Sequence, residues 1–365
     1  MTKRVEGVDF TAPGPKLRLG RSLSKRNGKG FQMRHTTLSV AAIALVAAGG
    51  QAQAPSKPAP AIDRSILHVQ VILDQLGFGP GVLDGRGGQS LVAALKGFQE
   101  ARGLPRTGKP DRRTLGALSQ YRAKRPTVAI TLTRDVLTGP YINPLPKDYA
   151  LQAKLPTLGY RTPMEKLGEM FHTTPAVLIE LNSPGTRLKV GSKIVVPNAL
   201  PSSRAYDQKL RGDWRQTLSM LNVDATQPTA DHIVVDKSDS VLRVLDKNDK
   251  LIAQFSATMG SEKDPLPIGN WKINGADYNP KFHYNPDLFW DAKKDDDPAM
   301  LPPGPNGPVG VVWIDLSKEH YGIHGTPNPE TIGRAESHGC IRLTNWDAAR
   351  LAMMIKPGTK AVFKS

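Results

Sequence analysis

The spacing of apolar residues changes along the chain from a helical period to a strand period. From Ile62 to Leu76 they recur three or four positions apart, which predicts an amphipathic helix that ends at Gly77. Ser90 and Asp111 are residue types that cap helices, and apolar faces follow both. After residue 231, short apolar runs separated by Asp and Ser turns predict strands at 233–235, 241–245 and 251–257. We therefore expect a small helical unit first, and an all-β domain of antiparallel hairpins last.

The part between these regions is less regular. Residues 160–198 predict two short helices, 164–171 and 176–181, followed by an apolar strand. Residues 124–156 are rich in proline, with one strand-like run at 128–132, and 199–230 has the polar composition of a linker, with a helix near Trp214. Near the C-terminus, Thr344 or Asn345 is expected to cap a helix that precedes a last strand at 361–363.

Residues 278–308 form a long insertion rich in aromatic residues and proline. Loops of this length inside a compact domain are usually functional or disordered. Tyr278, Tyr284 and Trp290 could offer a substrate apolar walls with polar tips. The alternative is that these rings form a local hydrophobic cluster.

The N-terminal residues predict export. Residues 33–54 begin with a short basic region at Arg34, continue with the apolar run 38–48 and end in Ala52-Gln53-Ala54. This is the pattern of a cleaved signal peptide, and its apolar run is too short for a transmembrane helix. The alternative is an uncleaved membrane anchor, which would be the chain's one contact with a membrane. Residues 1–32 are a polar, basic extension of doubtful status, with Met33 as a candidate start.

The charge of the chain is strongly positive. It has 365 residues and a formal charge of +16, of which residues 1–32 contribute +6 and Arg34 contributes +1. Without residues 1–54 the chain would still carry +9. A basic exported protein suits an acidic polymer such as a cell wall. Because no basic helix or aromatic RNA-binding motif is present, we do not expect nucleic acid as a partner.

The candidate chemistry lies between Tyr321 and Leu343. This stretch holds the single cysteine, Cys340, together with His324 and His338. A cysteine thiolate is a strong nucleophile that needs a nearby base or cation. The period of a strand would put His338, Cys340 and Arg342 on one face, where the arginine could bind a carboxylate.

Two other interpretations of these residues stay open. One is a buried structural cysteine beside two packed histidines. The other is a catalytic zinc site made of His324, His338 and Cys340. The sequence lacks the HExxH or CxxC pairs that would support zinc, so no metal is expected.

The motifs IHG at 323–325 and SHGCIRL at 337–343 resemble those of the L,D-transpeptidase catalytic domain. The resemblance covers 231–365 and implies a mainly β domain of the sandwich type that needs no cofactor. It implies that Cys340 attacks a carbonyl of a peptidoglycan tetrapeptide stem, with His324 as general base. His338 and Gly339, with the Cys340 amide, would shape the oxyanion site. Ser337 and Arg342 would contact substrate.

Two further resemblances concern the region before this domain. Residues 62–122, with LGFGPGVLDGRGG and ALKGFQEARGLPRTGKPD, resemble a three-helix peptidoglycan-binding domain. Residues 160–198 resemble a degenerate LysM module, a small α+β unit, which lacks its first strand and the usual Gly-Asp-Thr helix opening. The implied multidomain order is thus a helical domain, a LysM-like module, a linker at 199–230 and the catalytic domain.

Taken together, these resemblances imply a periplasmic or cell-envelope transferase that cross-links peptidoglycan through a cysteine thioester. Its partners would be stem peptides and glycan. The acceptor amine could belong to another stem, a lipoprotein or a free D-amino acid. The alternatives are an L,D-carboxypeptidase, in which water replaces the amine, a non-catalytic peptidoglycan-binding protein, and a structural spacer.

Overall fold

The computed structural model describes residues 61–289, 292, 297–335, 337 and 339–365. The predicted extension 1–32, the predicted signal peptide 33–54, Trp290 and His338 lie outside the described residues. The predictions for these residues therefore stay predictions. Among the described residues, no helix combines the length and the apolar character needed to traverse a bilayer.

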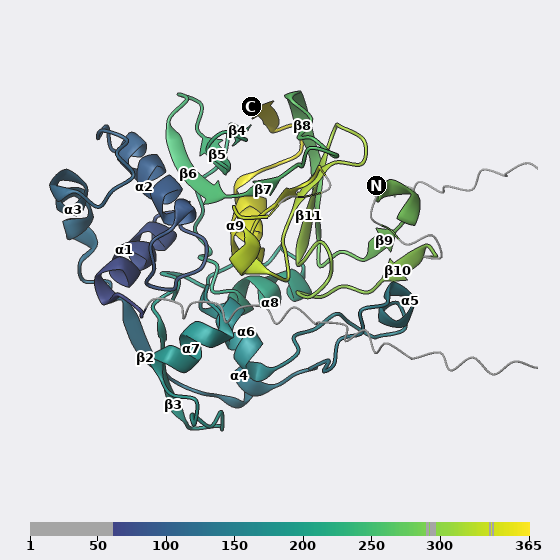
Figure 1. The fold of residues 1–365 in the computed structure, drawn as a ribbon, viewed down its shortest axis with the longest axis horizontal. Coiled ribbons are helices and arrows are strands. Elements are labelled where there is room, and N and C mark those ends of the chain that lie inside the picture. The colour runs from purple at the N-terminus through teal and green to yellow at the C-terminus, as the bar shows by residue number, and fades with distance from the viewer. Residues whose placement is uncertain (1–60, 290–291, 293–296, 336, 338) are drawn as a thin grey trace, which may run out of the picture. The chain divides into compact units, whose positions relative to one another are not determined.

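The first described elements are the predicted helices (Figure 1), namely α1 (Arg64–Gln75), α2 (Gln89–Ala101), α3 (Arg112–Leu118) and the 3-10 helix η1 (Ser119–Tyr121). As predicted, Asp111 caps α3 by accepting the Thr114 amide. The start of α2 differs from the prediction: its cap position is Gly88, and Ser90 lies inside the first turn. The three helices bury a small core that includes Leu73, Phe78, Leu95 and Phe98, and Leu251 of the C-terminal part completes it.

A middle module follows the helical domain. Its strands β2 (Thr127–Thr131) and β3 (Lys193–Pro197) pair antiparallel. Between them lie the helices α4 (Arg134–Leu137), α5 (Tyr149–Gln152), α6 (Pro163–Met170) and α7 (Pro175–Leu181). The predicted range 160–198 thus omits a strand, because residues 132–162 separate β2 from the two helices that pack on the pair. The resemblance to LysM stays a prediction.

The C-terminal part is mainly β, as predicted. Its strands are β4 (His232–Asp236), β5 (Val241–Leu245), β6 (Leu251–Ser256), β7 (Thr258–Met259), β8 (Gly269–Tyr278), β11 (Val312–Leu316), β12 (Gly322–His324), β13 (Ile341–Arg342) and β14 (Lys360–Lys364). Together with β1 (Phe78–Gly79) of the helical domain they form one sheet, in the order β1-β6-β5-β4-β14-β8-β11-β12-β13-β7.

Strand β8 joins the two halves of this sheet. Its residues 269–272 pair with β14, and its residues 273–278 pair with β11. Both halves contribute to one core around α9 (Asn345–Met354), which lies between β4–β6 and β11 (Figure 1). Buried side chains of this core include Ile233, Phe255, Ile314, Ile323, Trp346 and Leu351.

The sheet is mixed, which corrects the expected series of antiparallel hairpins. Three pairs are parallel, namely β14 with β4, β12 with β13, and β1 with β6. The chain returns through α9 before its last strand pairs with β4, and a helical connection of this kind permits parallel neighbours. The apolar pattern of each strand indicates which face is buried, but it does not indicate which strand is the neighbour.

Residues 199–230 are not a linker, which is a second correction. They contain α8 (Gly212–Met220), whose Trp214 and Leu218 are fully buried in the core of the C-terminal part. Leu221 and Val223 are buried beside them. Because these apolar residues lie on one face of a short helix, the polar composition of the segment hid its contribution to the core.

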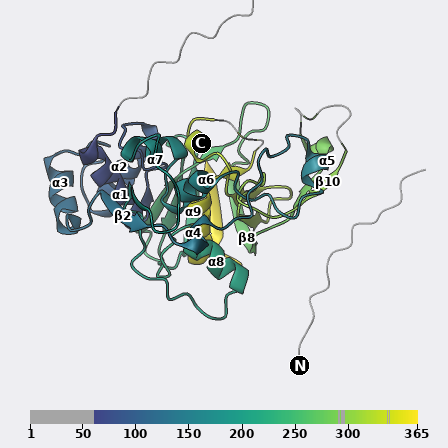
Figure 2. The same ribbon diagram turned by 90° about the horizontal axis from the view of Figure 1, so that it is seen from below.

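The insertion 278–308 packs against the middle module. It forms the hairpin β9 (Phe282–Tyr284) and β10 (Ala299–Leu301), with the 3-10 helix η2 (Pro286–Leu288) between them. Figure 2 shows β10 beside α5, and Leu158 donates its amide to the Pro303 carbonyl at 2.9 Å. The Asn306 amide in turn donates to the Leu158 carbonyl at 2.9 Å. The second arm of the insertion is therefore tied to the segment before α6.

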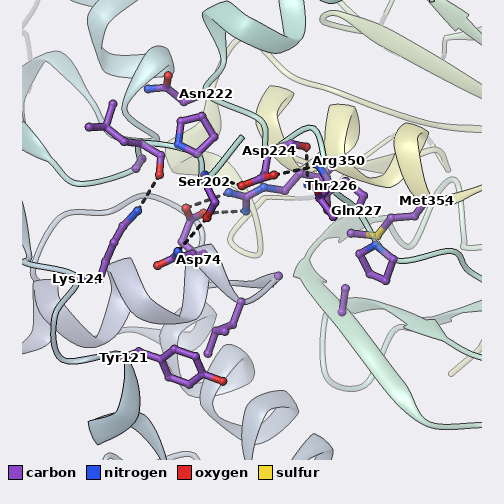
Figure 3. A pocket seen from close by; sticks show the side chains of 18 of the residues that line it. Asp74, Tyr121, Lys124, Ser202, Asn222, Asp224, Thr226, Gln227, Arg350 and Met354 are labelled. Atoms are coloured by element: carbon purple, nitrogen blue, oxygen red, sulfur yellow. Dashed lines mark hydrogen bonds and ion pairs between the residues drawn. The ribbon is translucent and has the colours of Figure 1, made fainter. Parts of the chain in front are cut away.

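A buried ionic cluster joins the helical domain, the middle module and α9. Arg350 of α9 donates to both carboxylate oxygens of Asp74 in α1, at 2.8 and 3.0 Å (Figure 3). His172, which follows α6, contacts Asp74 at 3.0 Å and stacks on Trp346 of α9 with ring centres 5.0 Å apart. Burial raises the pKa of Asp74, but the charges of Arg350 and His172 outweigh it and hold that pKa well below its usual range.

We expect Arg350→Met to lower the free energy of unfolding by about 3–5 kcal/mol, because it leaves the buried Asp74 carboxylate without its main partner. Arg211→Met provides a matched control, because Arg211 pairs with Asp213 on the surface, where both side chains are about half exposed. That change should cost only about 0–1 kcal/mol. Urea unfolding of both variants measures the difference, and similar losses would contradict a buried ionic connection.

Candidate active site

The paired strands β12 and β13 bring the predicted catalytic residues together. They run parallel, with Ile323 opposite Ile341 and His324 opposite Arg342. Cys340 directly precedes β13, and its thiol therefore lies against the start of β12. The sulfur contacts the His320 carbonyl oxygen at 3.8 Å, and the Gly322 amide also points to it. Among the described residues, the thiol makes no direct hydrogen bond to His324.

The Cys340 thiol is protonated near neutral pH. Burial raises the pKa of Cys340, while the Gly322 amide and the charge of Arg342 counteract that effect in part. The structure therefore holds a neutral thiol close to groups that stabilise its thiolate form. Such a nucleophile needs a base to remove its proton as it reacts.

The turn before Cys340 depends on glycine. Gly339 has φ +91°, a conformation that side chains other than glycine rarely adopt. A Cβ atom at this position would also lie only 2.6 Å from the Tyr321 ring. Gly339 thus fixes the direction from which the chain enters Cys340.

Ser337, which was predicted to contact substrate, makes hydrogen bonds within the protein. It is buried, and its Oγ donates to the Cys340 carbonyl oxygen at 2.6 Å while accepting the Gly260 amide at 2.7 Å. Because both bonds are internal, the hydroxyl connects the nucleophile turn to the end of β7 rather than facing a ligand.

His324 is buried and held in one tautomer. Its Nδ1 lies 2.7 Å from the Gly325 carbonyl oxygen, which can only accept, so Nδ1 carries the proton and Nε2 is left as an acceptor. Its ring stacks on Trp313 of β11 with centres 5.6 Å apart. Burial, and then the charge of Arg342, lowers the pKa of His324 to about 4. The imidazole is therefore neutral at physiological pH, as a general base must be.

The aromatic residues predicted as substrate walls pack elsewhere. Tyr284 is 5% exposed, with its ring 4.4 Å from that of Tyr149 and 5.5 Å from that of Phe289. This is the local hydrophobic cluster of the alternative interpretation. Tyr278 lies on β8 and stacks on Trp214 of α8 at 4.5 Å. The ring contacts described for Tyr278 and Tyr284 are thus with other aromatic residues, and their role at the substrate stays a prediction.

No cluster of three His, Cys, Asp or Glu side chains that could hold a metal ion is found among the described residues. His338 lies outside them, so the alternative of a zinc site with His324 and Cys340 is not tested here.

Comparison with known families matches two parts of the chain. Residues 230–363 match the model of the L,D-transpeptidase catalytic domain, and residues 63–118 match a domain described as "Putative peptidoglycan binding domain". The C-terminal part of the chain is an L,D-transpeptidase catalytic domain. The resemblances to these two families are thereby confirmed, whereas the LysM-like module is not shown by these matches.

Curated relatives carry names of the same family. The chain is 55% identical over 58 residues to the "Putative L,D-transpeptidase YkuD" of Bacillus licheniformis, an alignment that covers 16% of this chain and 35% of the relative. It is 28% identical over 140 residues to the "Putative L,D-transpeptidase YqjB" of Bacillus subtilis, covering 37% of this chain and 72% of that protein. The chain thus spans about a third of the YkuD relative that it matches.

Solved structures of similar proteins include an L,D-transpeptidase from Mycobacterium smegmatis, at 21% identity and a TM-score of 0.31, covering 36% of this chain and 58% of that one. The catalytic domain of an L,D-transpeptidase from E. faecium matches at 19% identity and a TM-score of 0.29, over 38% of this chain and 98% of that domain.

Sequence reasoning missed the residues that support His324. Asn345, the first residue of α9, is completely buried beside Gly325, the residue whose carbonyl binds His324. A Cβ atom on Gly325 would lie 2.1 Å from the Asn345 Oδ1, so only glycine allows this approach. The Asn345 Oδ1 also accepts the Val311 amide at 3.3 Å. The sequence offers little indication of this role for Asn345, because an asparagine at the start of a helix usually indicates only a cap.

The Asn345 amide is held from both sides of the domain boundary, because its Nδ2 donates to the Pro305 carbonyl oxygen of the catalytic domain at 3.2 Å and also reaches the middle module. Its Nδ2 donates to Glu169 of α6 at 2.9 and 3.0 Å, and Glu169 also accepts the Tyr160 hydroxyl at 3.1 Å. Burial raises the pKa of Glu169 to about 8, although these two hydrogen bonds favour its charged form. A neutral carboxyl of the middle module therefore supports the residue that lies against the His324–Gly325 peptide.

We expect Glu169→Gln to leave the fold intact and to make stability less dependent on pH. The folded protein keeps the Glu169 proton up to a pKa of about 8, whereas the unfolded chain releases it near the ordinary value of 4.5. The native protein therefore loses stability between these pH values, and a glutamine would not share that loss. At pH 5, Glu169→Ala should cost about 1–3 kcal/mol, because the buried Asn345 amide loses its carboxyl partner and keeps only the Pro305 carbonyl oxygen at 3.2 Å. That cost should shrink as the pH rises, because the alanine variant does not share the pH-dependent loss of the native protein.

Denaturant unfolding of the three proteins at pH 5 and pH 8.5 measures both effects. The advantage of the glutamine variant over the native protein should grow with pH. If that advantage is the same at both pH values, Glu169 is not protonated in the folded state.

Proposed function

We propose that this protein is an L,D-transpeptidase that acts on peptidoglycan through a Cys340 acyl-enzyme. The observation that best supports the proposal is the pairing of β12 with β13. It sets a neutral imidazole whose Nε2 is left as an acceptor on one strand and a thiol directly before the adjoining strand. The family of the catalytic domain and the peptidoglycan-binding domain support peptidoglycan as the partner and the cell envelope as the location.

In the first half-reaction, the Cys340 sulfur attacks the carbonyl of the third residue of a tetrapeptide stem. The thiol proton passes to Nε2 of His324, and a carbon–sulfur bond forms as the carbonyl oxygen becomes an oxyanion. The proton then moves to the nitrogen of the terminal D-residue, and the carbon–nitrogen bond breaks. A thioester and a free D-amino acid result.

In the second half-reaction, an acceptor amine attacks the thioester and His324 removes its proton. A new amide forms and the Cys340 thiol is restored. The acceptor would be an amine of another stem, of a lipoprotein or of a free D-amino acid. The amides of Gly339 and Cys340, with that of His338, are the proposed donors to the oxyanion, and one such donor is worth about 3 kcal/mol.

Arg342 is proposed to bind the substrate near the nucleophile. It lies opposite His324 in the strand pair, and its charge acts on both His324 and Cys340. A guanidinium at this position would suit a carboxylate of the stem peptide.

The same site allows two other functions. With water in place of the amine, the thioester would hydrolyse and the enzyme would be an L,D-carboxypeptidase. Without turnover, the protein would bind peptidoglycan through its helical domain alone. Export through residues 33–54 remains part of the proposal, because the substrate lies outside the cytoplasm.

We expect Cys340→Ala to abolish turnover of disaccharide-tetrapeptide without loss of folding. The native protein should give cross-linked dimers or lose one D-residue, and it should show a thioester adduct on the intact protein by mass spectrometry. His324→Ala should slow the reaction at least about 10²-fold, as expected for loss of a general base.

His283→Ala is the matched control, because His283 is exposed on β9, outside the strand pair. It should react at the native rate. Turnover that survives in Cys340→Ala would reject the mechanism. A loss in His324→Ala no larger than that in the control would assign the base to another residue.

In the pH profile of kcat/KM, the fall of activity on the acid side, the acid limb, should occur at an unusually low pH. His324 accepts a proton only when it is neutral, and its pKa in the folded protein is about 4 instead of the ordinary 6.5. Activity should therefore persist at pH 5.5 and fall as the pH drops through about 4. Arg342→Gln should move this limb upward, because the arginine charge is one cause of the low pKa. A limb near 6.5 in the native enzyme would contradict the base role of the buried His324.

A further inference from the structure

Three cavities follow one another along residues 327–334, the segment that leads from His324 towards Cys340. Their volumes are about 400, 350 and 520 Å³. The first and second share Ala176 and Glu330 in their linings, and the second and third share Gly88 and Ser90. Neighbouring cavities therefore border one another, and the surface that they line together is called here the three-module groove.

Each module supplies a wall of this groove. The catalytic domain contributes residues 327–334, which include the 3-10 helix η3 (Pro329–Thr331). The helical domain contributes the loop 80–88 and the start of α2, and the middle module contributes the start of α7. The walls approach closely between Gly333 and Ser90, where a Cβ atom on the glycine would lie 3.4 Å from the serine Oγ.

The catalytic wall is fixed to the strands beside Cys340. Oγ1 of Thr258 in β7 accepts the Gly333 amide at 2.9 Å. Thr258 is in turn the register partner of Arg342 in β13. A ligand in the groove would therefore be held at a constant position relative to the nucleophile.

The groove carries charges of both signs, although the whole chain is strongly basic, and its lining includes Asp84, Glu330 and Arg334. Three ion pairs lie in its lining, namely Arg86 with Glu180 at 2.5 Å, Lys96 with Asp239 at 3.2 Å and Arg161 with Glu165 at 2.5 Å. Hydroxyl groups of Ser90, Ser238 and Ser240 lie between them, and the side chain of Val92 is 40% exposed. Such a surface suits an elongated, polar and uncharged ligand better than a polyanion.

The cavity in Figure 3, of about 440 Å³, is different in this respect. Lys124 donates to the Leu200 carbonyl oxygen at 2.7 Å, and Asp74 is bound by Arg350. Its charged groups are thus engaged in joining the modules. Unlike the three-module groove, it has no lining residue between 327 and 334.

We propose that the three-module groove binds a glycan strand of peptidoglycan, a polymer of N-acetylated amino sugars, and so presents the attached stem peptide to Cys340. The substrate class rests on the proposed function. Three cavities in a row suit several consecutive sugars, whose apolar faces and hydroxyl groups would match the mixed lining.

Ala176→Trp tests the groove with little risk to the fold. Ala176 is exposed on α7, lines two of the three cavities and is too small to make packing contacts of its own. Ile179→Trp is the matched control, because Ile179 is 38% exposed on the same helix but lines none of the three cavities. Both changes are made in the full chain carrying Cys340→Ala, so that binding is measured without chemistry.

The probes are an N-acetylglucosamine hexamer and glycan strands stripped of stem peptides, with a free tetrapeptide as comparison. Ala176→Trp should weaken glycan binding at least tenfold, while Ile179→Trp stays within twofold of the parent. Equal glycan binding by both variants would overturn the proposal. A loss confined to the tetrapeptide would also overturn it, and would make the groove a peptide site.

This experiment separates the two proposals. If the protein with an intact Cys340 shows no turnover but Ala176→Trp still abolishes glycan binding, the groove stands and the transpeptidase mechanism falls. If turnover of free tetrapeptide is normal and glycan binding does not respond to Ala176→Trp, the mechanism stands and the groove proposal falls.

Discussion

The buried bond between Arg350 and Asp74 is the constraint on which the arrangement of the described modules depends. A charge of this kind, removed from water, is tolerated only where its partner is fixed. It therefore fixes α9 against α1. Two neighbours of Arg350 on the same helix make similar contacts, because Trp346 stacks on His172 and Asn345 binds Glu169. Helix α9 belongs to the catalytic domain, yet its buried side contacts both preceding modules.

This arrangement links the remote modules to the active site through short, rigid steps. Glu169 holds Asn345, and Asn345 lies against Gly325. Gly325 accepts the Nδ1 proton of His324 and so sets which nitrogen is free to act as a base. Each step is a buried contact between groups that cannot find water instead, so a shift of α6 would reach the imidazole without passing through solvent. The parts outside the catalytic domain thus form part of its support.

The sequence predicted the helices and strands well, but it did not predict which strands pair or which segments are buried in the core. Asp111 and Thr344 acted as the expected caps, because capping is a local interaction between a side chain and the next turn. The parallel pairing of β14 with β4 could not be read from the strands, because it depends on the path through α9. The residues 199–230 were mistaken for a linker, because a few apolar residues, Trp214 among them, are enough to bury a short helix.

In the candidate site too, local motifs could be recognised in the sequence, whereas contacts between distant segments could not. Cys340 and His324 were singled out from their motifs, because a reactive thiol needs a base within reach. The structure places His324 on β12 and Cys340 directly before its partner β13, and their catalytic roles stay a proposal. The internal contacts of Ser337, Glu169 and Trp313 could not be predicted, because they join distant segments, as the Ser337 hydroxyl does with the Gly260 amide. Tyr284 was expected at the substrate, but the ring of Tyr149, more than a hundred residues earlier in the chain, encloses it.

The electrostatics of the site favour a neutral resting pair. Burial raises the pKa of Cys340 and lowers that of His324, so both effects oppose transfer of the proton before substrate arrives. The charge of Arg342 lowers both pKa values, which stabilises a thiolate but destabilises an imidazolium. Its two effects on the ion pair therefore oppose one another. After the attack, the negative charge lies on the substrate oxygen, so stabilisation of the thiolate no longer matters. The charge of Arg342 still destabilises the imidazolium of His324, and this favours transfer of its proton to the leaving amine. In the proposed reaction, Arg342 would thus promote the collapse of the tetrahedral intermediate rather than its formation.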